Sequence, residues 1–189
     1  MTMHVLETSR LFMRPLVLSD LEDVHRLHTD PLVVQSLFSG EPPSRQNTQQ
    51  KMDQYVHAWR QNGFGFFGVF LKGNSQEQAQ FAGRAGLRHF EDTADVEYGL
   101  CLFGHVAGRG VGPELGGAIL RHAFEDLGLQ RVVALIRPDN ERAVRAAEKI
   151  GFTHVEDRPY GDRVKGFYQV RPSQYGIVRQ SSGPRNHVG

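Results

Sequence analysis

Three alternating glycines, Gly108, Gly110 and Gly112, stand directly before Pro113 in the segment "HVAGRGVGPELGGAILRHAF". A strand that ends in such glycines and turns into a helix exposes backbone N–H groups at the positive end of the helix dipole. Such a loop suits a phosphate or pyrophosphate, and Arg109 could add a charge-assisted contact. A tight turn without a ligand explains the same glycines equally well, so the surrounding sequence must decide between the two.

Two nucleotide-binding alternatives fit this loop poorly. A dinucleotide site has Gly-x-Gly-x-x-Gly and an acidic residue at the end of the next strand, whereas here the next strand, "RVVALI", runs into Arg137 and Pro138. A phosphate-binding loop of the NTPase kind needs Gly-Lys-Ser/Thr, which this loop lacks. An NAD(P) oxidoreductase therefore stays a distant alternative.

The elements around the loop alternate between strands and helices. Strands are expected at 79–89 and 95–103, joined by the acidic turn "EDTAD" as an antiparallel meander. After the loop, apolar residues recur every four positions up to Leu127, which predicts a helix of about fifteen residues that ends at Gly128. The strand "RVVALI" and a second helix in "DNERAVRAAEKIGF" follow, so the sequence predicts an α/β (α+β) chain with a mixed sheet.

The first third of the chain predicts a strand, two helices and another strand. The opening strand alternates Leu11 and Met13 with polar neighbours, a helix begins at Ser19 or Asp20 and stops at Pro31, and a second helix covers 45–61. The segment "NGFGFFGVFLK" suits a strand, with its phenylalanines in the core, and "GNSQEQAQ" a turn. Near the end, strands are expected at 152–157 and 164–171.

Length and composition indicate one domain, residues 1–171, followed by a small polar tail, residues 172–189, expected to be disordered. The net charge of +1, with scattered Arg and Lys, disfavours a nucleic-acid partner. Cys101 is the only cysteine, which fits a reducing compartment. No segment resembles a signal peptide or a membrane helix, so a cytoplasmic protein without a membrane partner is expected.

Four segments together resemble the GNAT superfamily of acyl-CoA-dependent N-acetyltransferases, in particular the branch of the ribosomal-protein N-terminal acetyltransferases. They occur in the family's order and span roughly residues 5–171: "LETSRLFMRPL" with "SDLEDVHRL" and "DPLV", the central strand "VEYGLCL", the loop "GRGVGPEL", and "RPDNERAVRAAEKIGF". The resemblance implies a mostly antiparallel, twisted mixed sheet with splayed central parallel strands, flanked by helices.

The resemblance also implies acetyl-CoA as co-substrate, with its pantetheine between the central strand and "RVVALI". The implied cofactor contacts are the backbone of Leu100, Cys101 and Leu102, the loop amides of Gly108, Arg109, Gly110, Val111 and Gly112, and the side chain of Asn140. For Asn140, a plain helix N-cap is an equally good interpretation.

Three positions depart from the family's pattern. Ala107 stands where many relatives carry Gln or Arg, and Ala143 and Ala147 stand where the Ser or Tyr proton donors of relatives lie. The thiolate leaving group must then take its proton from water or from another residue, with Tyr160 and Tyr168 as candidates, unless the protein is a non-catalytic acyl-CoA-binding or sensing module.

Glu97 is the candidate general base. An amine acceptor is largely protonated near neutral pH, so a carboxylate on the central strand within one water of the nucleophile would assist the reaction. A structural ion pair with an arginine such as Arg88 is the alternative for Glu97.

The remaining candidates are weaker. His25 and His28, three apart on a helix expected to be exposed, have no third ligand, so no metal is expected. Cys101 is expected to be a buried thiol, and His89 and His105 to be ordinary strand-end residues rather than acceptor ligands. Trp59 and Phe38 are further acceptor-site candidates.

The sequence therefore predicts an acetyltransferase that moves an acetyl group from acetyl-CoA to a primary amine, on a peptide N-terminus or a small molecule. The acceptor's identity is left open, and a homodimer is compatible with the family.

Overall fold

The structure is a computed structural model that describes residues 4–38, 40–73, 78–161 and 163–175. Its helices are α1 (Leu21–His28), α2 (Pro31–Leu37), α3 (Arg45–Asn62), α4 (Val111–Arg121) and α5 (Glu141–Lys149). Its strands are β1 (Leu6–Glu7), β2 (Leu11–Pro15), β3 (Phe66–Leu71), β4 (Gln80–His89), β5 (Val96–Leu102), β6 (Val132–Ile136), β7 (Thr153–Tyr160) and β8 (Arg163–Val170). Within the described ranges, no helix is long and apolar enough to cross a membrane.

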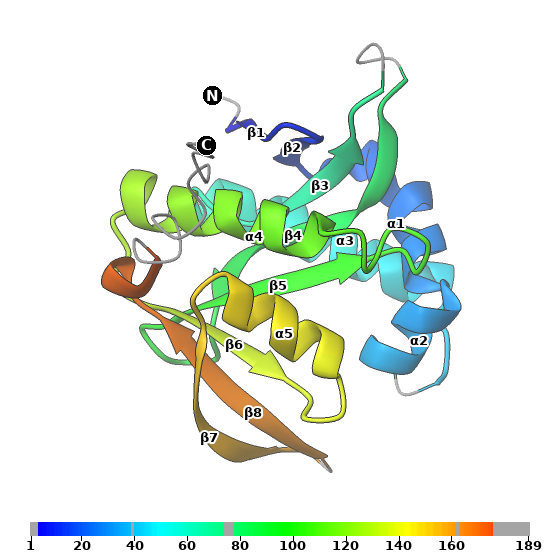
Figure 1. Ribbon diagram of the computed structural model, residues 1–189. Coiled ribbons are helices and arrows are strands. Elements are labelled where there is room, and N and C mark those ends of the chain that lie inside the picture. The colour runs from blue at the N-terminus through cyan, green and yellow to red at the C-terminus, as the bar shows by residue number, and fades with distance from the viewer. Residues whose placement is uncertain (1–3, 39, 74–77, 162, 176–189) are drawn as a thin grey trace, which may run out of the picture.

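The eight strands form one sheet in the order β1-β2-β3-β4-β5-β6-β8-β7. Every neighbouring pair is antiparallel except β5 and β6, which run parallel and are joined in register by a single pair, Glu97 with Val133. The two central strands therefore diverge beyond this point, as Figure 1 shows between β5 and β6. The mixed, mostly antiparallel sheet with splayed parallel strands is confirmed.

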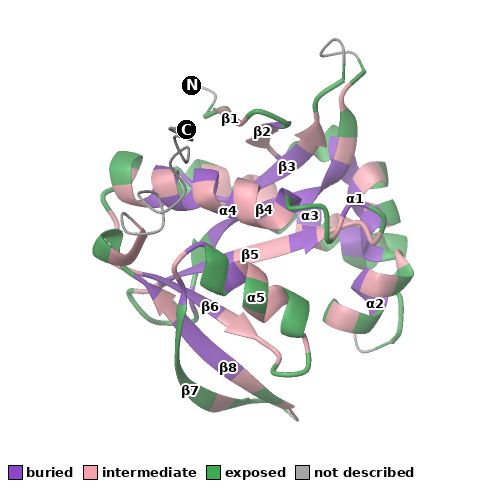
Figure 2. Ribbon diagram, in the orientation of Figure 1, coloured by how far each residue is buried: buried purple, intermediate pink, exposed green. Residues whose placement is uncertain are grey.

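Helices cover both faces of the sheet. In Figure 1, α4 and α5 lie in front of the strands and α3 lies behind them. The main core lies under α4, where Leu115 and Ile119 are fully buried against residues of β4 to β6. A second cluster packs Leu21, Val24 and Met52 of α1 and α3 on Phe66 of β3. In Figure 2 the middle of the sheet is largely buried, and the edge strand β7 is mostly exposed.

The local expectations for the elements are largely confirmed. Helix α4 continues in a π-helical turn, His122–Asp126, and Gly128 follows in the left-handed region with φ +68°. Helix α2 was not predicted: Pro31 begins this helix at its first turn, behind the capping carboxylate of Asp30, whereas α1 has already ended at His28.

Two predicted segments extend beyond the described residues. Within the expected turn at 73–80, residues 74–77 lie outside them, as do residues 176–189 of the expected tail. Residues 172–175 form a helical turn, and the Tyr175 hydroxyl donates a hydrogen bond to the carbonyl of Gly117 on α4.

Candidate active site

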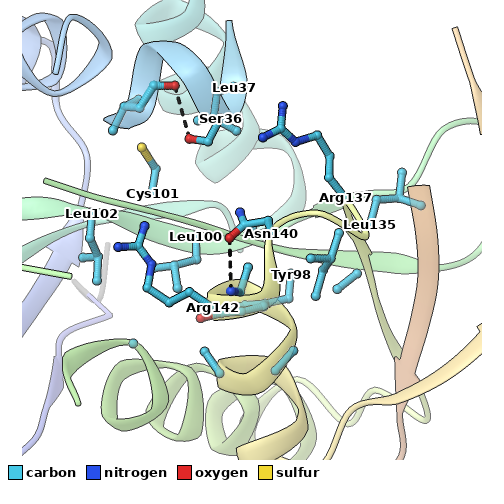
Figure 3. A pocket seen from close by; sticks show the side chains of 18 of the residues that line it. Ser36, Leu37, Tyr98, Leu100, Cys101, Leu102, Leu135, Arg137, Asn140 and Arg142 are labelled. Atoms are coloured by element: carbon cyan, nitrogen blue, oxygen red, sulfur yellow. Dashed lines mark hydrogen bonds between the residues drawn. The ribbon is translucent and has the colours of Figure 1, made fainter. Parts of the chain in front are cut away.

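A cavity of about 950 Å³ opens where β5 and β6 diverge (Figure 3). Successive residues of a strand point to opposite faces of its sheet. Both sets of β5 residues line this cavity: Glu97, Gly99 and Cys101 from one face, and Tyr98, Leu100 and Leu102 from the other. The cavity therefore connects the two faces of the sheet through the splay, and it includes the three backbone positions expected to pair with pantetheine.

The glycine loop forms one wall of this cavity through Gly108, Gly110 and Gly112. Gly108 and Gly110 have φ of +85° and +75°, in the left-handed region that glycine adopts without a steric cost. The amides on either side of the loop are bonded, Ala107 to the Phe103 carbonyl and Glu114 to the Gly110 carbonyl. Among the described residues, no group accepts from the amides of residues 108 to 112. This cluster of N–H groups fits a pyrophosphate.

Glu114 anchors the helix that follows the loop. Its carboxylate accepts hydrogen bonds from the Thr8 hydroxyl at 2.5 Å, the Arg10 amide at 3.1 Å and Arg10 Nε at 2.6 Å. Burial raises the pKa of Glu114, but the hydrogen bonds from Thr8 and Arg10 outweigh it and hold the pKa below its usual value. The N-terminal strands thereby fix the start of α4.

The side chains of two loop residues, Arg109 and Val111, lie outside the cavity lining, and the contacts predicted for their amides stay predictions. The carbonyl of Arg109 accepts a hydrogen bond from Arg10 Nη1 at 2.9 Å. Val111 is buried in the core beneath the loop. Three lining cations of α5 were missed: Arg142, Arg145 and Lys149. Their spacing of three and four residues along a predicted helix is a signal that the sequence did contain.

Asn140 begins α5 and also lines the cavity. Its side-chain oxygen accepts from the Ala143 amide at 3.2 Å, so its role as an N-cap is confirmed. In the described part of the chain no group accepts from its Nδ2 atom, so the expected contact to the cofactor stays a prediction (Figure 3).

Glu97 is buried and lines the cavity near the point where β5 and β6 separate. Arg88 Nε and Nη2 both contact its Oε2 atom, at 2.8 and 2.7 Å, so the expected ion pair with Arg88 is present. Because both contacts end on the same oxygen, Oε1 is left for another donor. Among the described lining residues, Glu97 is the only carboxylate.

Tyr160 and Lys165 approach the same cavity from β7 and β8. Lys165 Nζ lies 3.8 Å from the ring centroid of Tyr160, and burial lowers the pKa of Lys165 although the Glu97 charge opposes this shift. Of the two tyrosines suggested as proton donors, Tyr160 lines the cavity. Tyr168 does not line it and packs against His154 instead.

Ala143 and Ala147 line the cavity without a side chain that could donate a proton. The Tyr98 hydroxyl, which the sequence analysis did not consider, is buried with no hydrogen-bond partner in the described structure, and burial raises its pKa. Cys101 is also buried, which raises the pKa of its thiol to about 11. It is therefore a protonated core residue near neutral pH, as expected.

The remaining acceptor-site candidates differ in whether they line the cavity. Phe38 lines the cavity, whereas His89, His105 and Trp59 do not. Trp59 Nε1 donates to the Phe66 carbonyl at 2.8 Å, which gives the indole a structural role. In the described ranges, no group of three or more His, Cys, Asp or Glu side chains is placed to hold a metal ion.

The expectation that His25 and His28 share an exposed helix face is wrong for His28, which is fully buried. Its Nε2 atom lies 3.3 Å from Arg84 Nε, which donates to it. Burial, followed by the charges of Arg84 and Lys51, lowers the pKa of His28 to about 3, so the ring is neutral. The helix is amphipathic, and His28 lies on its inner side.

Comparisons with known proteins agree on one family. A model described as an acetyltransferase (GNAT) domain matches residues 10–153. The FsC-acetyl coenzyme A-N(2)-transacetylase of Aspergillus fumigatus is 30% identical over 167 residues, which cover 80% of this chain and 66% of that protein, slightly less than two thirds.

Solved structures agree with this match. An acetyltransferase from Agrobacterium tumefaciens superimposes with a TM-score of 0.76 at 26% identity, covering 90% of this chain and 96% of that one. A spermidine N-acetyltransferase from Vibrio cholerae, solved with CoA and spermine, superimposes with a TM-score of 0.71 at 20% identity and covers 89% and 99% of the two chains. The second comparison is a likeness of fold.

Proposed function

This chain belongs to the GNAT acetyltransferase family, and we propose that it moves an acetyl group from acetyl-CoA to a primary amine by direct transfer. One observation supports the proposal: a single cavity is lined both by the loop glycines Gly108, Gly110 and Gly112 and by the buried carboxylate of Glu97. The thioester of a cofactor whose pyrophosphate is held by the loop amides would meet an amine held near the carboxylate where β5 and β6 separate.

The residues present fit coenzyme A. The loop offers N–H donors at the start of α4 and no acidic side chain toward the cavity, while Arg142 and Lys149 of α5 add positive charge to the lining. The known structure with CoA and the transacetylase that uses an acetyl coenzyme A both support this cofactor. We assign the pantetheine to the backbone of Leu100, Cys101 and Leu102, beside the splay.

The proposed reaction needs one proton transfer before the acyl transfer and one after it. Glu97 takes a proton from the ammonium form of the acceptor, directly or through one water, and Arg88 keeps the carboxylate in place. The amine lone pair then forms the N–C bond to the thioester carbonyl carbon, the C–S bond breaks, and its electron pair stays on the sulfur. The second amine proton finally reaches the thiolate, which gives the amide and free CoA.

Water or Tyr160 carries that last proton in our proposal, because Ala143 and Ala147 cannot. Tyr160 lines the cavity, and Lys165 Nζ lies against its ring. The backbone N–H groups of β5 next to the splay supply hydrogen bonds that polarise the thioester carbonyl.

The test is the release of free CoA thiol from acetyl-CoA in the presence of a panel of amines and N-terminal peptides, with the acetylated amine identified by mass. We expect amine-dependent release above the blank without amine. If no amine or peptide releases thiol above the blank, the proposed transfer is wrong.

The two alanines favour one second candidate, a module that binds acyl-CoA without catalysis. Such a module would bind acetyl-CoA tightly, and Glu97→Gln would change neither binding nor the background rate of thiol release. A rate that depends on Glu97 excludes this candidate.

A further inference from the structure

Arg84 of β4 is buried at 8% exposure, yet no carboxylate of the described residues forms an ion pair with it. Its Nε donates to the neutral ring of His28, and among the described residues no group accepts a hydrogen bond from Nη1 or Nη2. An arginine side chain stays protonated under all ordinary conditions, and a buried charge is costly unless it is paired. Because Arg84 lines the cavity, the missing partner has room to bind there.

The surroundings of Arg84 hold the guanidinium in place without neutralising it. Its Cζ atom lies 4.7 Å from the ring centroid of Phe66 and 5.1 Å from that of Tyr55, which are cation–π distances. His28 fixes Nε from the other side. The planar group is therefore oriented before any ligand arrives, and a fixed guanidinium fork matches the two oxygens of a carboxylate.

Two further cations strengthen the positive charge at this end of the cavity. Lys51 of α3 and Arg88 of β4 both line it, and Glu97, the one carboxylate in the described lining, is engaged by Arg88. Burial lowers the pKa of Lys51, and the charges of Arg84 and Arg88 lower it further. Three cations thus face one carboxylate, which leaves an excess of positive charge that an anionic ligand would relieve.

The position of Arg84 relative to Glu97 suits a small molecule with two functional groups. Arg84 and Arg88 are paired in register with Cys101 and Glu97, so all four lie on one face of the sheet. The Phe66 ring under Arg84 also covers Gly99, where a Cβ atom would be 2.9 Å from Phe66 Cζ. Gly99 is two residues, about 7 Å, from Glu97 along β5.

We propose that the acceptor is a small amine that also carries a carboxylate, and that Arg84 and Lys51 bind this carboxylate while the amine lies near Glu97. The proposal rests on the acetyltransferase function proposed above and adds the chemical class of its acceptor. Arg84 acts as a specificity determinant, with His28, Tyr55 and Phe66 positioning its guanidinium.

The test compares acids with their uncharged amides, using glycine, phenylalanine and 4-aminobutyrate, each against its primary amide. Thiol release gives kcat/KM for every amine, and calorimetry with saturating CoA gives the Kd of each N-acetylated product. The second readout needs no turnover. Because a charge-assisted pair is worth considerably more than a neutral hydrogen bond, we expect at least one acid to be preferred over its amide by about 10- to 100-fold in both readouts.

Variants test which residues cause the preference for acids over amides. Arg84→Met should reduce the ratio of acid to amide to about one and Lys51→Met should reduce it in part, while the Kd for acetyl-CoA stays unchanged. Arg60→Met is the matched control, because Arg60 is an exposed residue on the same helix as Lys51 and lies outside the cavity lining. If Arg84→Met does not fold, the ratio of acid to amide in the unmodified protein and in Lys51→Met still tests whether the cations bind the carboxylate.

The inference is overturned if no acid binds or reacts better than its amide, or if the preference survives in both Arg84→Met and Lys51→Met. Failure of the proposed function looks different. In that case no amine, charged or neutral, releases thiol, and the product Kd values alone show whether the cavity prefers a carboxylate.

Discussion

The two ends of the cavity are built in opposite ways. The end that we propose for the cofactor presents backbone amides from one contiguous segment, residues 108 to 112, at the start of α4. The end that we propose for the acceptor presents side chains from four separate elements, with Lys51 on α3, Arg84 on β4, Glu97 on β5 and Lys165 on β8. If these proposals hold, the shared cofactor is bound by local backbone geometry, whereas selectivity for the acceptor depends on side chains that only the complete fold assembles.

Replacing the one carboxylate should produce the largest effect. We expect Glu97→Gln to lower kcat by about 100- to 1000-fold, in the range found for general base catalysis, with the Kd for acetyl-CoA changed by less than about twofold. Steady-state rates and calorimetry measure the two quantities. Glu148→Gln, on the exposed side of α5, is the control and should leave both unchanged. A parallel loss of affinity for acetyl-CoA in Glu97→Gln would mean that the acceptor end of the cavity also contributes to cofactor binding.

His28, which is buried beside the acceptor end, should make the free energy of unfolding depend on pH. The pKa of His28 is about 3 in the folded protein against 6.5 in the unfolded chain, so the unfolded state takes up a proton first as the pH falls. As the pH falls below 6.5, His28 should therefore reduce the free energy of unfolding, with a slope that approaches about 1.4 kcal/mol per pH unit between about pH 5.5 and 4.

Denaturant unfolding of the unmodified protein and of His28→Gln at several pH values measures this contribution. The variant should lose that part of the slope, because glutamine does not titrate. Identical slopes in the two proteins would show that His28 is accessible to protons in the folded state.

A change confined to the loop should affect the cofactor end alone. Gly110→Ala places a Cβ atom at φ +75°, which costs about 1–2 kcal/mol, and a loop that moves to relieve this strain takes its amides out of position, so we expect acetyl-CoA to bind about tenfold more weakly. The KM for the acceptor should not change. If acetyl-CoA affinity is unaffected while acceptor binding weakens, the assignment of the two ends is reversed.

The smallest effect is expected from a glycine that serves neither end. Gly117 lies within α4, and a Cβ atom there would meet no atom within 4 Å. Gly117→Ala should raise the free energy of unfolding by about 0.5–1 kcal/mol through helix propensity, with kcat and both affinities unchanged. Thermal unfolding checks the first part. If Gly117→Ala changes the affinity for acetyl-CoA, the effect of a glycine substitution on cofactor binding is not confined to the loop.

The same contrast explains how far the sequence could be interpreted. The glycine loop and the Asn140 cap depend on neighbouring residues, so glycine spacing and the helix pattern were enough to predict them, whereas the splayed strands were implied by the family resemblance. The helical spacing of Arg142 and Arg145 indicated that they share one side of a helix, but their place in the cavity lining was not recognised. Such features require only local geometry.

The acceptor end contained no comparable signal. Arg84 stands in "AGRAGL" among small and apolar residues, and only the packing of α1 and α3 on β4 brings His28, Tyr55 and Lys51 around it. His28 was expected to be exposed, because the sequence of a short polar helix does not show whether a histidine lies on its buried side or on its exposed side. Contacts between residues 56 positions apart, as for His28 and Arg84, are set by the tertiary fold.

The most direct test of the central claim is a calorimetric titration of the protein with acetyl-CoA, compared with NAD and repeated on Gly110→Ala. We expect acetyl-CoA to bind, NAD not to bind, and the loop variant to bind acetyl-CoA about tenfold more weakly. Absence of acetyl-CoA binding, or equal binding in the unmodified protein and the loop variant, would contradict the conclusion that these backbone amides hold the cofactor.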